Sequence, residues 1–168
     1  MPQLVLIRTA SPNDYLDIAR LRALSLGLPE DSLQLRFKAE FERFRDADRW
    51  NLWTAWLNEI LIGYGRTEVL TTDNNPYETT RSLPVGWYLR GIVVHPSVRR
   101  QGIARELTVT RLKWLSQRTS VVFCFLDAEE KASVPLYLSL GFTEVSRDWD
   151  FRDLRDDRGV LLQRTEPC

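Results

Sequence analysis

Two arginines and a glycine stand where the sequence predicts that a strand gives way to a helix. Arg99 and Arg100 precede Gly102, and the pattern predicts a strand ending at Val94 and a helix beginning at Gln101. The N-terminus of a helix presents N–H groups and the positive end of its dipole, and both attract phosphate. Glycine lets the backbone approach an anion closely, and arginine adds charge and forked donors. The junction therefore predicts a phosphate or pyrophosphate site, although similar junctions also occur as simple packing features.

The same residues form part of a longer motif. Arg99, Gly102 and Ala104 give the pattern Arg-x-x-Gly-x-Ala, which follows a predicted strand that ends in Val-x-Pro. A second pattern, Leu-Tyr-x-x-Leu-Gly-Phe, covers residues 136–142. In this order the two motifs resemble those of the GNAT-type N-acetyltransferases over roughly residues 85–145. The rest of the chain fits that family only in the order of its elements.

The resemblance implies acetyl-CoA as co-substrate. In that family, backbone N–H groups of the loop, here residues 100–105, hold the pyrophosphate. The pantetheine arm lies beside the fourth strand, so backbone groups of Ile92 and Val94 are expected to bond to it. An N–H near Val93 or Val94 is expected to contact the thioester carbonyl. The implied donor-binding residues are Ile92, Val93, Val94, Arg99, Arg100, Gln101, Gly102, Ile103, Ala104, Arg105, Asp127 and Ser133.

The second motif supplies a candidate acid. Tyr137 matches the family tyrosine that can protonate the departing thiolate; the alternative is packing on an amphipathic helix. Ser133, one turn earlier, is either a pantetheine ligand or a small helix residue. Asp127 and Glu130 stand where many members carry asparagine, and an ionised carboxylate cannot donate. Their pantetheine bonds are therefore either lost or mediated by water. Asp127 could instead act on the substrate amine, whereas Glu130 suits a helix N-terminus.

No general base stands out. The family often places a glutamate on the fourth strand, but residues 86–91 read Gly-Trp-Tyr-Leu-Arg-Gly. Glu68 on the preceding predicted strand is a candidate catalytic base, directly or through water, and can equally be a solvated strand carboxylate. An acceptor amine of low pKa would need only a chain of water molecules.

Composition describes one ordinary domain without a strong electrostatic field. The chain has 168 residues, 43% of them hydrophobic, which is enough for a core. Its 23 basic and 23 acidic residues cancel, so we expect neither nucleic acid nor an anionic membrane as partner. The N-terminus has no basic region before a long apolar run, so no signal peptide or membrane span is expected.

The cysteines and the histidine indicate no metal. Cys124 lies in an apolar predicted strand and Cys168 is the last residue, which is neither a disulfide framework nor a metal-binding spacing. His95, the single histidine, is interpreted as a turn residue before Pro96. We therefore expect no metal cofactor and a reducing, cytoplasmic location.

Hydrophobic spacing and turn residues predict a β-α-α-β-β-β-α-β-α-β-β order. Strands are predicted over 4–8, 50–57, 60–70, 85–94, 121–126, 142–151 and 159–163, and helices over 11–27, 31–45, 101–117 and 130–140. This order predicts an α/β, single-domain GNAT-like fold over residues 1–168, with a mixed, mostly antiparallel sheet of about seven strands flanked by about four helices. The fingerprints of dinucleotide-binding and P-loop domains are missing, which argues against a nucleotide-binding domain.

These features predict an N-acetyltransferase in which an amine attacks acetyl-CoA directly in a ternary complex. The acceptor is expected to be a small-molecule or peptide amine, and the acids within 148–157 would suit a cationic aminoglycoside-like compound. Arginines interleaved there favour a solvated charged hairpin instead. The tryptophans that could line the acceptor pocket, or more commonly the core, are Trp50, Trp53, Trp56, Trp87 and Trp149. The alternative is a non-catalytic acyl-CoA-binding or sensing module on the same fold, and either a monomer or a homodimer fits.

Overall fold

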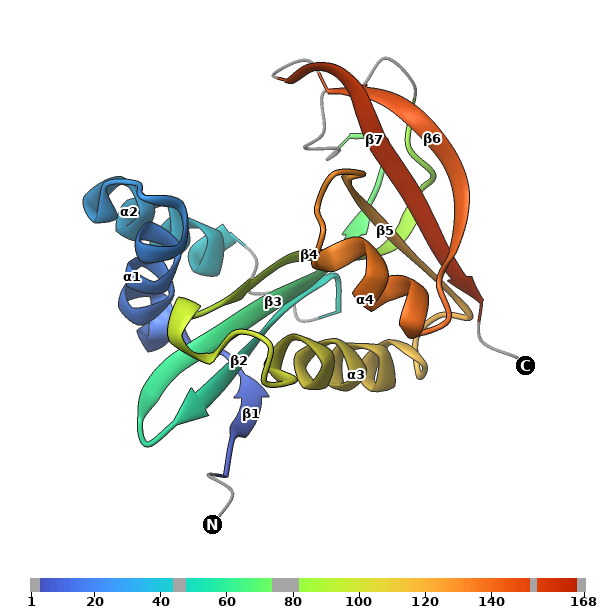
Figure 1. Ribbon diagram of the computed structural model, residues 1–168. Helices are drawn as coiled ribbons and strands as arrows, with labels where there is room; N and C mark the ends of the chain where they lie inside the picture. Colours follow the sequence, from blue (N-terminus) through green and yellow to red (C-terminus); the bar gives the residue numbers. More distant parts are fainter. Residues whose placement is uncertain (1–3, 44–47, 74–81, 152–153, 166–168) are drawn as a thin grey trace. The chain divides into compact units, whose positions relative to one another are not determined.

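The computed structural model describes residues 4–43, 48–73, 82–151 and 154–165, with the backbone alone between 148 and 158. These described residues form seven strands, four α-helices and two 3-10 turns (Figure 1). In chain order they are β1 (Leu6–Thr9), η1 (Pro12–Asp14), α1 (Tyr15–Leu26), α2 (Glu30–Arg43), β2 (Trp50–Leu57), β3 (Ile60–Leu70), β4 (Gly86–Val94), η2 (Pro96–Val98), α3 (Ile103–Leu115), β5 (Val121–Asp127), α4 (Ser133–Ser139), β6 (Thr143–Phe151) and β7 (Leu154–Thr165).

The described strands form one sheet in the order β1-β2-β3-β4-β5-β7-β6. β1 pairs antiparallel with β2, and β7 pairs antiparallel with both β5 and β6. β4 pairs parallel with β5, with Trp87 opposite Val122 and Tyr88 opposite Phe123. A parallel pair needs a crossover connection, and α3 supplies it. The expected α/β class, with a mixed, mostly antiparallel sheet and four helices, is confirmed.

The chain divides into two units. The first comprises Met1–Thr67 with Gly91–Arg111, and the second comprises Glu68–Arg90 with Leu112–Cys168. The boundary between the units falls within β3, after Thr67, and within β4, after Arg90. Each unit therefore consists of two separate stretches of the sequence. None of the helices in the described part of the chain has the length and apolar composition that a membrane span requires.

In the first unit, α1 and α2 lie side by side and bury their apolar residues against β2 and β3 (Figure 1). Phe37 of α2 meets Tyr64 of β3 edge to face, with ring centroids 5.8 Å apart. Phe41 meets Trp50 of β2 in the same way at 5.5 Å. Gly27 ends α1 in the left-handed conformation, at φ 64°, as its position after the last apolar residue predicts. These contacts fix α2 over one face of β3.

The opposite face of β3 receives α3 at unusually short range. A Cβ atom on Gly63 would lie 3.1 Å from the Leu107 side chain, and one on Gly65 would lie 2.8 Å from the guanidinium carbon of Arg111. A side chain at either position would force the Leu107 or Arg111 side chain to move away from β3. α3, and with it the helix N-terminus at Ile103, is therefore anchored through its packing on β3.

The second unit has its own core between β4, β5, β7, α4 and the end of α3. Trp87 and Trp114 meet edge to face at 5.4 Å within it. Cys124 is buried there, as the apolar strand predicts, and it forms no disulfide with another described residue. β6 and β7 form an antiparallel hairpin in which Phe151 lies opposite Leu154 (Figure 1). The charged side chains of its tip lie outside the described residues, so their expected role stays a prediction.

Most element boundaries match the sequence-based prediction, and the largest difference concerns β7, which was predicted over 159–163 and spans Leu154–Thr165. The start of α4 also differs. The helix predicted over 130–140 begins only at Ser133, because residues 128–132 form turns after β5. Asn58 and Glu59 join β2 to β3 with both residues left-handed, at φ 49° and 64°, which is typical of a two-residue hairpin turn. The long polar loop expected around residues 74–81 lies outside the described residues.

The structure also places the tryptophans. Trp50 and Trp87 are buried in the two cores, which agrees with the packing interpretation. Trp53 and Trp56 are partly buried beside β1. The side chain of Trp149 lies outside the described residues.

Candidate functional site

A short 3-10 turn holds the loop between β4 and α3. The His95 N–H donates to the carbonyl of Ile62 at 2.8 Å, which extends the strand pairing to the end of β4. His95 Nδ1 accepts from the Ser97 N–H at 3.2 Å and lies 2.7 Å from the Ser97 hydroxyl. Val98 N–H donates to the His95 carbonyl at 3.1 Å. His95 is therefore the turn residue that the sequence predicts.

The two loop arginines behave differently. Arg99 turns back and donates from Nε to the carbonyl of Val94 at 3.1 Å, so part of its guanidinium stabilises the loop itself. Arg100 is exposed and has φ 65°, a left-handed conformation that costs a non-glycine residue about 1 kcal/mol. No hydrogen bond or ion pair with another described residue involves its side chain. An unusual backbone conformation with an exposed cation at a loop is typical of a ligand site.

Gly102 and the start of α3 complete this loop. Gly102 has φ 88°, and a Cβ placed on it would meet nothing within 4 Å. The Glu106 N–H donates to the Gly102 carbonyl at 3.0 Å, which is the first turn of the helix. The preceding N–H groups have no partner inside the helix and point out of its N-terminal end. The open space over Gly102 therefore faces N–H groups and the positive end of the helix dipole, which is an arrangement suited to a phosphate.

The last residues of β4 lead directly into this loop. Val93 is buried in one core cluster of the first unit, whereas Ile92 and Val94 are partly buried in another, so their side chains alternate across the strand. Gly91, with φ 44°, interrupts the extended backbone just before them. The structure thus brings the predicted residues from Ile92 to Arg105 together within the first unit.

The other predicted site residues belong to the second unit and are described within it. Tyr137 is 3% exposed on α4 and meets Phe142 edge to face, with centroids 5.4 Å apart. It is more deeply packed than an amphipathic surface position would be. Ser133 is the first residue of α4 and is partly buried.

Asp127 has a local structural task. Its carboxylate Oδ1 accepts from the Glu129 N–H at 2.9 Å, and its carbonyl accepts from the Glu130 N–H at 3.0 Å. These bonds close a turn after β5 and delay the start of α4. A shallow depression in this region is lined by Ala128, Glu129, Glu130, Lys131, Val134 and Pro135.

The model of the acetyltransferase (GNAT) family matches residues 17–142. The chain belongs to this GNAT acetyltransferase family. A comparison with curated protein sequences gave no match.

Solved GNAT structures share the fold at low sequence identity. The ribosomal-protein-S18-alanine N-acetyltransferase of Escherichia coli is 19% identical, with a TM-score of 0.70 over 98% of this chain and 96% of that one. The PaiA N-acetyltransferase of Thermoplasma acidophilum, solved with coenzyme A, is 12% identical, with a TM-score of 0.71 over 96% and 99%. The aminoglycoside N-acetyltransferase AAC(6')-Iy, also with CoA, is 23% identical, with a TM-score of 0.69 over 90% and 96%. At these identities the likeness supports the GNAT fold alone.

The candidate base of this GNAT chain is engaged in an ion pair. The Glu68 carboxylate on β3 accepts from the guanidinium of Arg90 on β4, and the two side chains are only 11% and 14% exposed. Glu68 is therefore a paired and mostly buried carboxylate, not the solvated strand residue that was the alternative, and its role as a base stays a prediction.

A second group of charged residues, in the first unit, was missed by the sequence interpretation. Arg66 Nη1 donates to both carboxylate oxygens of Glu40, at 3.1 and 3.0 Å, and Arg36 Nε donates to Glu40 at 3.3 Å. Nearby on β3, the Tyr64 hydroxyl accepts from Arg22 at 3.4 Å. Burial raises the pKa of the Tyr64 phenol, against the opposing effect of Arg22. Tyr64 therefore stays protonated near neutral pH.

One sequence signal could have found this group. Glycines at positions 63 and 65 alternate with Tyr64 and Arg66 on a predicted strand. Alternation places both glycines on one face and both large polar residues on the other. A strand with one face reserved for close helix packing thus predicts that Tyr64 and Arg66 share the opposite face, where α1 and α2 bring Arg22 and Glu40.

Proposed function

We propose that this chain transfers an acetyl group from acetyl-CoA to an acceptor amine. The observation that carries the proposal is the loop between β4 and α3. It combines the left-handed Arg100, the open space over Gly102 and the N-terminus of α3. Membership of the GNAT acetyltransferase family supports acetyl-CoA as the donor. In this proposal residues 1–168 form a single N-acetyltransferase domain.

The donor is held mainly by backbone groups. N–H groups of residues 100–105 take the pyrophosphate, with Arg100 and the remaining nitrogens of Arg99 adding positive charge. Backbone groups of Ile92 and Val94 take the pantetheine, although the Val94 carbonyl already accepts one bond from Arg99. Ser133 is a further pantetheine ligand in this proposal. Asp127 contributes by ordering the turn that precedes Ser133, because its carboxylate accepts a hydrogen bond within that turn.

The chemistry is a direct transfer within a ternary complex. The acceptor nitrogen bonds to the thioester carbon, the carbon–sulfur bond breaks, and the sulfur leaves as a thiolate that takes up a proton. A backbone N–H near Val93 or Val94 stabilises the negative charge that develops on the carbonyl oxygen. Tyr137 supplies the proton to the thiolate. Glu68, or water beside it, accepts the proton that the amine loses.

A second candidate function is a non-catalytic acyl-CoA-binding module. Two observations favour it: the Asp127 carboxylate is used in a turn, and the Glu68 carboxylate is held by Arg90. Such a module would bind the donor without turning over any amine. The buried Cys124, which forms no disulfide with another described residue, suits a reducing cytoplasm for either function.

One titration followed by one assay tests both functions. Calorimetry with acetyl-CoA is expected to give saturable binding, whereas ATP and NAD give none. Thiol release is then followed with small amines, peptides and aminoglycosides as acceptors. Binding together with release supports the transferase, and binding without release supports the module. Absence of acetyl-CoA binding would overturn the donor site.

A further inference from the structure

Among the described residues, Arg66 on β3 forms hydrogen bonds through only one of its terminal nitrogens. Nη1 donates to both oxygens of Glu40, at 3.1 and 3.0 Å, and the two side chains are 14% and 15% exposed. Glu40 also accepts from Arg36 Nε at 3.3 Å. The carboxylate of Glu40 is thus shared between two guanidinium groups, while the plane of the Arg66 guanidinium is held in place.

The other edge of the Arg66 guanidinium lies beside Gly91 of β4. A Cβ atom on Gly91 would be 3.8 Å from Nε and 3.8 Å from Nη2 of Arg66. Among the described residues, no acceptor bonds to these two nitrogens. Gly91 is exposed and left-handed, at φ 44°, and as a glycine it places no side chain between this edge and the solvent. Two parallel N–H donors on a mostly buried guanidinium match the two oxygens of a carboxylate.

The surrounding charges also favour an anion. The ion pairs and hydrogen bonds around Tyr64 contain three guanidinium groups, of Arg22, Arg36 and Arg66, and one carboxylate, of Glu40. Tyr64 is 2% exposed and accepts from Arg22, so its own proton is available to donate. Partly buried positive charge in excess of its counter-ions attracts a negatively charged ligand.

We infer that the Nε–Nη2 edge of Arg66, beside Gly91, binds a carboxylate of the acceptor. The acceptor is then an amine that also carries a carboxylate, such as an amino acid or a peptide, and not a polycation of the aminoglycoside type. This inference rests on the proposed function. Gly91 directly precedes Ile92 and Val93, whose backbone that function assigns to the donor, and all of these residues lie in the first unit with Arg66. A carboxylate held at Gly91 would therefore keep its amine near the acyl group.

The test compares acceptors that differ only in the carboxylate. Thiol release from acetyl-CoA is measured with amino acids and short peptides, with the same compounds as C-terminal amides, and with kanamycin. The unmodified protein is expected to favour the free carboxylates by roughly 10- to 100-fold in kcat/KM, the range for hydrogen bonds to a charged group. Arg66→Gln is expected to remove this preference, and Arg66→Lys to restore only a part of it, because lysine lacks the fork.

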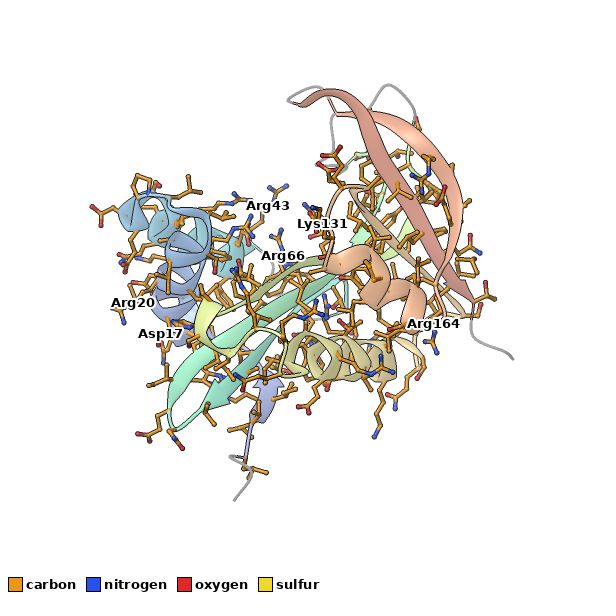
Figure 2. All side chains as sticks on the ribbon, viewed as in Figure 1. Asp17, Arg20, Arg43, Arg66, Lys131 and Arg164 are labelled. Carbon is orange, nitrogen blue, oxygen red and sulfur yellow. The ribbon has the colours of Figure 1, made fainter. Side chains whose placement is uncertain are left out.

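Two substitutions of Gly91 change what lies beside the Nε–Nη2 edge of Arg66 and leave the Arg66–Glu40 ion pair intact. Gly91→Asp places a carboxylate beside Nε and Nη2 and is expected to exclude carboxylate acceptors. Asparagine tolerates the same left-handed backbone but carries no charge, so Gly91→Asn is expected to exclude carboxylate acceptors less strongly. Arg20→Gln is the control for loss of an arginine, because Arg20 is 67% exposed and lies on the outer side of α1, away from Arg66 (Figure 2).

Each outcome has one meaning when acetyl-CoA affinity and thermal unfolding are measured on the same samples. Selective loss of the carboxylate acceptors in Arg66→Gln and Gly91→Asp supports the inference. Faster turnover of amides or kanamycin than of the free carboxylates overturns it. An equal loss for all acceptors also overturns it, since Arg66 would then act on the acyl group. Donor binding with turnover only of acceptors that lack a carboxylate counts against the inference alone. Donor binding without turnover of any acceptor removes the proposed transferase, and absence of donor binding removes the donor site as well.

Discussion

The guanidinium group of Arg111 lies against the backbone of Gly65. Arg111 is fully buried, and it donates from Nη1 to the Arg66 carbonyl at 3.1 Å, from Nη2 to the Thr108 hydroxyl at 2.9 Å and from Nε to the Leu107 carbonyl at 3.3 Å. This single side chain therefore joins α3 to β3. It links the helix whose N-terminus forms the proposed phosphate site to the strand that carries Arg66.

Gly65→Ala is expected to lower the free energy of unfolding by about 1–3 kcal/mol, the usual cost of overpacking. The reason is that the new Cβ would lie 2.8 Å from Cζ of Arg111. Urea unfolding followed by tryptophan fluorescence measures the change. The control is a double-mutant cycle with Arg111→Ala: if the clash is the cause, Gly65→Ala costs less once Arg111 is shortened. Equal costs in both backgrounds would contradict the clash.

Gly102→Glu is expected to weaken acetyl-CoA binding by at least roughly 100-fold, because a negative charge would occupy the space meant for phosphate. Calorimetry gives the affinity. Gly102→Ala serves as the matched control. It shares the strain of φ 88°, which costs about 1 kcal/mol, but its Cβ meets nothing within 4 Å. Unchanged affinity in the glutamate variant would mean that the phosphate binds elsewhere.

Tyr137→Phe is expected to lower kcat by roughly 100-fold or more with little change in acetyl-CoA affinity, because the ring keeps its packing on Phe142 while the acid is lost. Steady-state kinetics and calorimetry separate the two effects. Tyr88→Phe is the comparison: that hydroxyl is bonded to the Pro84 carbonyl at 2.7 Å, so its loss should affect stability and spare turnover. If both variants retain full turnover, Tyr137 is a packing residue.

The Glu68–Arg90 pair can be separated by two substitutions. If Glu68 accepts the amine proton, Glu68→Gln lowers kcat and removes the acidic limb of the pH–rate profile. Arg90→Gln keeps the carboxylate and is expected to retain that limb. If the pair is only structural, the two substitutions lower stability to a similar extent and leave turnover unchanged.

The hydrogen-bonded carboxylate of Asp14 predicts that the folded protein loses stability in acid. Burial alone would raise the pKa of this carboxyl, but hydrogen bonds from Arg8 and from the Ser11 N–H outweigh burial and hold the pKa below its usual value. Its stabilising effect is therefore complete above the ordinary pKa and disappears as the pH falls through the lower, folded value. Asp14→Asn is expected to cost about 1–3 kcal/mol at pH 7, and the cost should shrink below about pH 4.

A surface ion pair is the natural comparison for Asp14. Glu144 and Arg147 are 39% and 53% exposed, and such pairs contribute little. Glu144→Gln should therefore leave urea unfolding unchanged at pH 7 and at pH 4. A loss of stability in Asp14→Asn that does not depend on pH would show that charge is not the cause.

The residue pattern alone predicted the order of elements, the hairpin at Asn58-Glu59, the turn role of His95 and the strand–helix junction at Gly102. Each of these depends on a few neighbouring residues: turn residues that tolerate positive φ, a proline after a strand, or apolar spacing along one helix. The two motifs predicted the family for the same reason, because each is contiguous in the chain.

Only the tertiary structure decided which side chains meet. Arg66 and Glu40 are 26 positions apart in sequence, and Arg111 and the Arg66 carbonyl are 45 apart, so no local pattern pairs them. The late start of α4 is different, because it comes from a local turn in which the Asp127 carboxylate accepts the Glu129 N–H. The long-range contacts of Arg66 and Arg111 have no such local origin. Contacts of this kind arise from packing between distant segments, where burial, charge and the available space are set together. Local sequence thus determined the strand–helix junction at Gly102, whereas packing decided which side chains surround Gly91.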